Sequence, residues 1–276
     1  DYHNFATELA RADYYEAACE ILKQGVIVYP KDTDLLADYM MYAHKCGKHD
    51  IAKEKYNQLK AIDRIDWSWR SFVFSIDYYI DVIKGQKGDE RKATETTIEG
   101  LIIEFKEQLG NEEKAYLAEA DFLEAIGKRE EAIEALKKVV DDNTVAVCTQ
   151  CCLRYVDRCL EKGDYDEVIQ YSKKGITMTE EQESVETTAF WYFWALAADH
   201  EWFNENLSLE EPDKGSARKV IKLYDTMLRL EPNNRYASTA SKRKRMIASF
   251  ASIEIPKDET SHDVSQLLQM IKQAQN

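Results

Sequence analysis

The feature that most constrains this chain is a segment that recurs along it. The stretch IGKREEAIEALKKVV at 126–140 aligns with KGDYDEVIQYSKKGI at 162–176, and the stretch around Gly47 is a third copy. In each copy a glycine ends one helical stretch, a charged turn follows, and apolar residues then recur at helical spacing. The interval from Gly127 to Gly163 is close to the length of one helical hairpin. We therefore expect an array of stacked hairpins.

Length and composition agree with this expectation. The chain has 276 residues, more than one ordinary core needs, so two domains or a repeat array are expected. It contains 10 Gly and 4 Pro, which is few turn-forming residues for a β-sandwich or a β-barrel. Long stretches are dominated by Ala, Glu, Lys, Leu and Ile, a helix-rich composition. The sequence thus predicts an all-α protein.

These segments resemble the tetratricopeptide repeat, a helical hairpin of about 34 residues with the pattern W-x2-L-G-x2-Y, A-x3-F and P. In one unit Tyr116, Ala120 and Ala132 occupy pattern positions, and LRLEPNN at 228–234 is the most similar segment. The resemblance implies a right-handed superhelical solenoid of antiparallel helix hairpins with a C-terminal capping helix. The expected units lie near 1–32, 33–66, 67–112, 113–146, 149–184 and 188–234, with a cap at 235–254 and, at 255–276, a linker and a short amphipathic helix.

An aromatic run, AFWYFWALAADHEWF at 189–203, suits a membrane anchor, a ligand site or a core. Charged residues from Asp199 onward interrupt it, and a membrane span requires roughly 20 apolar residues, so the membrane interpretation fails. In the repeat frame Trp191 and Trp194 face a neighbouring helix, and we expect them in the core. The resemblance places three other side chains on the inner, concave face: Tyr192, Phe193 and Leu196.

The chain is acidic, with 51 Asp and Glu against 37 Lys and Arg and a net charge of −14. Nucleic acids bind clustered cations that replace phosphate counterions, so we expect no nucleic acid and no anionic membrane as a partner. The one basic cluster, KRKR at 242–245, is expected to be solvated or paired with acidic neighbours, with a nuclear signal or a phosphate contact as the alternative. No secretory signal is visible, and a cytoplasmic location is expected.

The six cysteines are expected to be reduced, as in a cytosolic protein. The cluster CTQCC at 148–152, with Cys159, has thiols at short spacing, as zinc sites do. These positions lie along one helix face without a partner CxxC or His pair, so we interpret them as small buried thiols and expect no metal. The sequence contains no GxSxG, HExxH or Gly-rich phosphate loop, and it predicts neither catalysis nor a cofactor.

The resemblance also implies that an extended or helical peptide binds the concave face. That face is expected to combine aromatic side chains with acidic groups, so it would attract a partner segment with apolar and basic residues. We therefore expect a non-enzymatic protein- or peptide-binding scaffold. The candidate peptide-binding residues are Met41, His44, Ser75, Tyr78, Asp121, Glu124, Arg154, Asp157, Tyr192, Phe193, Leu196 and Asp199.

Two alternatives stay open. Some bacterial regulators resemble this arrangement, with an N-terminal effector followed by repeats that sense a signalling peptide. A chain that begins at Asp1 rather than Met leaves room for such an effector. In the other alternative, the amphipathic segment at 262–273 occupies the groove of its own array.

Overall fold

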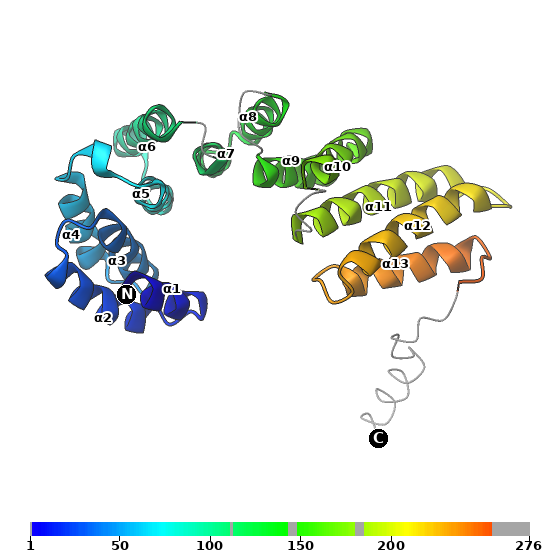
Figure 1. Ribbon diagram of the computed structural model, residues 1–276. Coiled ribbons are helices and arrows are strands. Elements are labelled where there is room, and N and C mark those ends of the chain that lie inside the picture. Colours follow the sequence, from blue (N-terminus) through cyan, green and yellow to red (C-terminus); the bar gives the residue numbers. More distant parts are fainter. Residues whose placement is uncertain (1, 111–112, 143–147, 180–184, 256–276) are drawn as a thin grey trace, which may run out of the picture. The chain divides into compact units, whose positions relative to one another are not determined.

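The computed structural model describes residues 2–110, 113–142, 148–179 and 185–255, and within these residues the regular structure is helical (Figure 1). A single 3-10 turn, η1, spans Arg64–Asp66. The helices are α1 (Tyr2–Arg11), α2 (Tyr15–Val28), α3 (Thr33–Lys45), α4 (His49–Lys60), α5 (Trp69–Ile83), α6 (Gly88–Leu109), α7 (Glu113–Ala125), α8 (Arg129–Asp141), α9 (Thr149–Lys162), α10 (Tyr165–Thr179), α11 (Val185–Asn206), α12 (Lys214–Leu230) and α13 (Ala237–Phe250).

The chain forms two compact units, one up to Tyr155 and one from Val156 on. In the first unit the helices pack in successive pairs, α1 with α2, α3 with α4, α5 with α6 and α7 with α8. The first helices of neighbouring pairs also contact each other, α1 with α3, α3 with α5 and α5 with α7. This two-layer order is the stacking expected of helical hairpins, in which each pair covers the apolar side of the next.

In the second unit α10, α11, α12 and α13 pack consecutively. Helix α13 lies within the expected cap at 235–254 and packs on α12. The predicted all-α hairpin array and its closing helix are thus confirmed. The division into six repeat units stays a prediction, and the expected helix at 262–273 lies outside the described residues.

Alanines recur where the helices approach one another, because a methyl side chain lets two backbones come close. Aromatic rings fill the wider spaces: Phe72 stacks on Phe105 with ring centroids 5.0 Å apart, and Trp67 lies 5.2 Å from Phe72. In the first unit the fully buried alanines at repeat positions are Ala6, Ala18, Ala43, Ala52, Ala120 and Ala132.

Side-chain caps fix where several helices begin. The Asp32 carboxylate accepts the N–H groups of Asp34 and Leu35 at the start of α3. Ser68 and Asp213 cap α5 and α12 in the same way. Each cap satisfies N–H groups that the first helical turn leaves without a partner.

The glycines that mark the repeat in the sequence end a helix in the same way each time. At the α7–α8 turn, the Gly127 N–H donates to the Glu124 carbonyl at 3.0 Å, and the next N–H, from Lys128, donates to the Leu123 carbonyl at 2.8 Å. This hydrogen-bond pattern needs a residue with positive φ, which glycine adopts without strain. The φ angles are 77° at Gly47, 83° at Gly127 and 77° at Gly163.

The aromatic run on α11 packs differently from the expectation. Trp191 and Trp194, expected in the core, are half-buried and stack on each other with centroids 5.1 Å apart. Tyr192 and Phe193, expected on an open face, are each 8% exposed, and Tyr192 stacks on Tyr236 at 4.3 Å. The difference arises because Tyr236, which directly precedes α13, covers the side of α11 that carries Tyr192 and Phe193. No described helix combines the length and the apolar character needed to cross a membrane.

Replacing Gly127 with Ala should lower the free energy of unfolding by about 1 kcal/mol, because the left-handed backbone conformation strains an L side chain. Urea denaturation measures this change. Gly100 is the matched control: it lies inside α6, and a Cβ there meets no atom within 4 Å. Gly100→Ala should leave stability unchanged or raise it by roughly 0.5–1 kcal/mol. Equal effects of the two substitutions would contradict the assigned turn.

Candidate functional site

A cavity of about 440 Å³ lies in the first unit, on the layer formed by the first helix of each helix pair. The three helices that line it are α3, α5 and α7, whose mutual contacts bring polar positions far apart in the sequence to one place. We call it the Asp77 cavity. Its lining residues are Lys45, Asp77, Ile80, Asp81, Lys84, Asp121, Glu124 and Ala125.

Most acidic groups of the Asp77 cavity already pair with cations. The Asp81 carboxylate lies 2.5 Å from the Lys84 Nζ, 3.8 Å from the Lys45 Nζ and 3.4 Å from the His44 Nε2. Burial alone would raise the pKa of Asp81, but the hydrogen bond from Lys84 and the nearby cations hold it below its usual value. Partial burial lowers the pKa of His44, although Asp81 opposes this change.

Arg154, near the start of α9, holds the other two carboxylates. Its Nη2 forms an ion pair with Asp121 and lies 3.3 Å from the Glu124 Oε2. Of the candidate residues, these three lie in one cluster between α7 and α9, and their role in binding a peptide stays a prediction. The single positive charge of Arg154 faces two carboxylates, so this cluster shapes the cavity wall and keeps a net negative charge.

Asp77 differs from its neighbours. Among the described residues its carboxylate takes part in no hydrogen bond or ion pair, although it is half-buried. Burial raises the pKa of Asp77 to about 6; Asp121 and Asp81 add to the rise, and Lys45 and Lys84 oppose it. An ionised Asp77 therefore lacks a close counterion in the cavity, which favours a bound cationic group. This residue was not predicted from the sequence, in which its only visible sign is the spacing of four from Asp81.

Two of the remaining candidates of the first unit, His44 and Tyr78, form an aromatic flank beside the cavity. The Tyr78 ring meets His44 edge-on at 5.2 Å and stacks on Tyr56 at 5.9 Å. Met41 and Ser75 are buried in the helix layer, so their side chains are not surface groups. The Ser75 hydroxyl has no hydrogen-bond partner within the described structure.

In the second unit, candidate Asp199 lies at the centre of a buried polar cluster. Its carboxylate is fully buried, accepts the Tyr224 hydroxyl at 2.9 Å and forms an ion pair with Arg243 of α13. Burial and the adjacent Asp199 raise the pKa of Tyr224, which keeps the hydroxyl a donor. Burial opposes the charge of Arg243, but the hydrogen bond to Asp199 raises its pKa. Asp199 therefore stabilises the helix packing.

The basic cluster at 242–245 is partly explained by these contacts. Arg243 pairs with Asp199, and the Lys244 Nζ lies 2.6 Å from Asp225, so pairing with acidic neighbours is confirmed for both. The other candidates in this unit are half-buried or internal. Asp157 lies 3.3 Å from Arg158, and Leu196 is half-buried on α11.

A second polar site in the first unit was not expected from the sequence. Asp38 of α3 is fully buried, with the His3 Nδ1 at 2.7 Å and the Arg70 Nη1 at 3.3 Å. Burial raises the pKa of Asp38 to about 6, against the effects of Arg70 and His3. These contacts join α1, α3 and α5 and serve the stacking of the helices.

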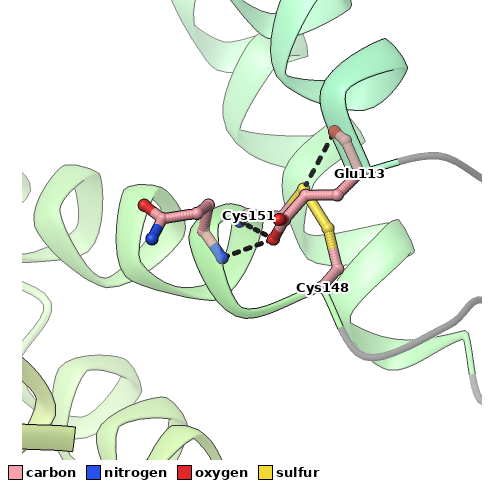
Figure 2. The surroundings of a disulfide bond; sticks show 4 residues. Glu113, Cys148 and Cys151 are labelled. Carbon is pink, nitrogen blue, oxygen red and sulfur yellow. Dashed lines mark hydrogen bonds between the residues drawn. A yellow bond between two sulfur atoms is a disulfide. The ribbon is translucent and has the colours of Figure 1, made fainter. Parts of the chain in front are cut away.

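The expectation of reduced cysteines is wrong for Cys148 and Cys151, which form a disulfide (Figure 2). The sequence interpretation placed both on one helix face. In the structure α9 begins at Thr149, so Cys148 lies one residue before the helix and its sulfur reaches that of Cys151. The buried thiols expected for Cys152 and Cys159 are confirmed.

A comparison with protein-family models finds no match, and a comparison with curated proteins finds none. Among solved structures, the TPR protein TTC0263 of Thermus thermophilus is 15% identical to this chain, with a TM-score of 0.51. The alignment includes 71% of this chain and 96% of TTC0263. A human IFIT1 dimer with m7Gppp-AAAA is 12% identical, with a TM-score of 0.45. That alignment includes 91% of this chain and 56% of the IFIT1 chain. The TPR domain of P58(IPK) is 11% identical, with coverage of 90% and 77% and a TM-score of 0.31.

The paired helices, the glycine turns and the similarity to TTC0263 define the class of this protein. Its fold is tetratricopeptide-like, an array of stacked helical hairpins.

The expectation that no nucleic acid binds is wrong as an exclusion. Human IFIT1 structures among these similar folds hold m7Gppp-AAAA and PPP-AAAA. The exclusion rested on the net charge of −14, which sums groups from every face of the molecule. A total of that kind does not describe the charge that lines one groove.

The Asp199 cluster gives a prediction about stability. Arg243→Met should lower the free energy of unfolding by about 3 kcal/mol, because it leaves a buried carboxylate without its cation. Thermal or urea denaturation measures the loss. Lys242→Met, at an exposed neighbouring position, is the matched control and should change little. The double variant Asp199→Asn/Arg243→Met should recover part of the loss. A single variant as stable as the control would contradict the assigned role.

Proposed function

We propose that this protein is a non-enzymatic scaffold that binds a protein or peptide segment on the layer formed by α3, α5, α7 and the start of α9. The bound segment places a Lys or Arg side chain in the Asp77 cavity and apolar side chains against the flank of Tyr78 and His44. The proposal includes the cytoplasmic location expected from the sequence.

The observation that carries the proposal is the unpaired Asp77 carboxylate. A cavity of about 440 Å³ is large enough for the end of a basic side chain, and Asp81 and Asp121 add negative potential nearby. A bare divalent metal ion fits less well, because the carboxylates of the cavity do not form a cluster of ligand distance in the described structure. A Lys or Arg head group is broader and bonds to acceptors that are further apart.

The flank of the cavity supports a peptide rather than a free cation. Tyr78 and His44 present partly exposed ring surface directly beside the charged lining. Aromatic surface of this kind contributes to binding when an apolar side chain covers it. A segment that combines the two residue types would use both parts of the site. The alternative of a peptide-sensing regulatory domain would use the same groove, and no described residue favours it.

Asp77→Asn should weaken the binding of a terminally blocked peptide of Leu and Lys about ten-fold, through loss of a charge-assisted contact. Fluorescence anisotropy measures the affinity, and a peptide with Gln in place of Lys tests the need for charge. Glu99→Gln removes the same charge from an exposed position on α6 and should leave the affinity unchanged. Equal binding of the Lys and Gln peptides would overturn the proposal, and so would competition by a triphosphorylated RNA that binds more tightly.

The affinity for the Lys peptide should rise as the pH rises toward about 6 and then level off. A bound cation favours ionised Asp77, so the complex holds fewer protons than the free protein, and binding strengthens as the pH rises through that pKa. His44 beside Asp81 contributes a smaller change of the same sign, because its protonation adds positive charge. The Asp77→Asn variant isolates the main effect, since it should retain only the smaller change. A wild-type profile that matches the variant would refute the assignment.

A further inference from the structure

The disulfide at the start of α9 is a chemically distinct site that the binding proposal does not use. Cys148 precedes the helix and Cys151 lies in its first turn, so the bond closes a loop of sequence separation 3. A disulfide that closes such a short loop restricts the unfolded chain little, since this effect grows with loop length. Its contribution to global stability is therefore small, and its consequence is local.

Glu113, the first residue of α7, lies against this disulfide (Figure 2). Its Oε1 accepts the Gln150 N–H at 2.5 Å and the Cys151 N–H at 3.4 Å, so it caps the N-terminus of α9 from another helix. The Cys151 Sγ lies 3.8 Å from the Glu113 carbonyl oxygen, an acceptor that a thiol could use after reduction. The oxidised Cys151 is bonded to Cys148, and a reduced Cys151 thiol would have the Glu113 carbonyl as its hydrogen-bond acceptor.

The charge of Glu113 affects the two states differently. The start of a helix stabilises a nearby thiolate, but a carboxylate beside the sulfur atoms repels it. A disulfide has no charge and lies next to the carboxylate without this cost. Glu113 therefore favours the oxidised pair over the thiolate form.

The site is connected to the Asp77 cavity through both helices. Arg154 lies one helical turn after Cys151, and its partners Asp121 and Glu124 are on the helix that Glu113 begins. The first turn of α9 therefore sets where Arg154 meets α7. Opening this turn would loosen the ion pairs that occupy the acidic wall of the cavity.

We propose that Cys148 and Cys151 form a reversible disulfide that exchanges with low-molecular-weight thiols and disulfides of the glutathione class, and that its state controls how firmly Arg154 is held at the cavity wall. The effect on ligand binding rests on the proposed function, whereas the exchange chemistry does not.

The chemistry balances as two consecutive exchange steps. One protein thiolate attacks a sulfur of the small disulfide, breaks its S–S bond and releases one small thiol, leaving a mixed disulfide. The second protein thiolate attacks the protein sulfur of that mixed disulfide, forms the Cys148–Cys151 bond and releases the second small thiol. The two cysteines are oxidised, the small disulfide is reduced to two thiols, and the two cysteine protons end on these thiols. Reduction of the protein is the reverse sequence.

A metal site is the competing interpretation. The ligand atoms of Glu113, Cys148 and Cys151 lie within 4.8 Å of one another, a spacing compatible with one ion. A structural zinc site uses four ligands, and here the Glu113 oxygen already accepts backbone N–H groups. The capped arrangement therefore favours the exchanging pair.

The test equilibrates the full chain in glutathione buffers of graded ratio, alkylates the free thiols and identifies them by peptide mass spectrometry. Cys148 and Cys151 should become alkylated together in one transition. Cys148→Ser should remove the joint transition and leave Cys151 either alkylated or as a glutathione mixed disulfide, whereas Cys152→Ser should not change the transition. Alkylation of Cys151 that is independent of the buffer would overturn the proposal, as would bound zinc in the reduced protein that protects both thiols.

Two further measurements separate the roles of the neighbouring residues. Glu113→Gln keeps an oxygen to cap α9 but removes the charge, so at about pH 8.5 the disulfide should be reduced at a roughly two- to five-fold lower ratio of thiol to disulfide. Glu119→Gln, further along α7, is the matched control. Amide hydrogen exchange over 149–155 should be faster in the reduced protein. Equal amide hydrogen exchange in the oxidised and reduced proteins would contradict the proposed effect of the disulfide on Arg154, whether or not a basic peptide binds.

Discussion

The helices of this protein bury an apolar side against neighbouring helices, and the rest of the structure depends on that contact. Fully buried alanines such as Ala52 and Ala132 let paired helices approach closely. The glycine turns reverse the chain at a fixed point, so successive pairs repeat the same geometry. As a result the first helices α3, α5 and α7 lie side by side, and charged residues from separate parts of the sequence meet on one layer.

Charge pairing on that layer separates structural from available groups. Asp81, Asp121 and Glu124 lie near cations of neighbouring helices, so they hold these helices in register. Asp77 occupies the same cavity without such a partner, and its raised pKa reflects the cost of a half-buried anion. A net count of acidic residues cannot distinguish a carboxylate that is paired with a cation from one that is not, although only the unpaired carboxylate suits a cationic ligand. The start of α9 contacts α7 of this layer and carries both Arg154 and Cys151.

The helical hairpins could be predicted from the sequence, because each turn and helix is determined by residues that are close together in the chain. Gly127 and the apolar stripe after it fix one turn and one helix without reference to distant residues. The site was harder, since it depends on contacts between helices. The i, i+4 spacing of Asp77 and Asp81 was visible, but which of them lacks a cation depends on side chains from α3 and α7. Likewise Tyr192 is buried only because Tyr236 covers it, and Cys148 bends toward Cys151 only because α9 begins one residue later.

The ion pair of Asp199 has a consequence for the order in which the second unit forms during translation. Its two partners are 44 residues apart in the sequence, and the carboxylate is made first. Until α13 is made, Asp199 has the Tyr224 hydroxyl of α12 beside it but not the Arg243 cation, so this ion pair forms last. The hairpin of α3 and α4, whose contacts are close in sequence, has no such requirement. The second unit therefore gains this ion pair only after α13 has left the ribosome.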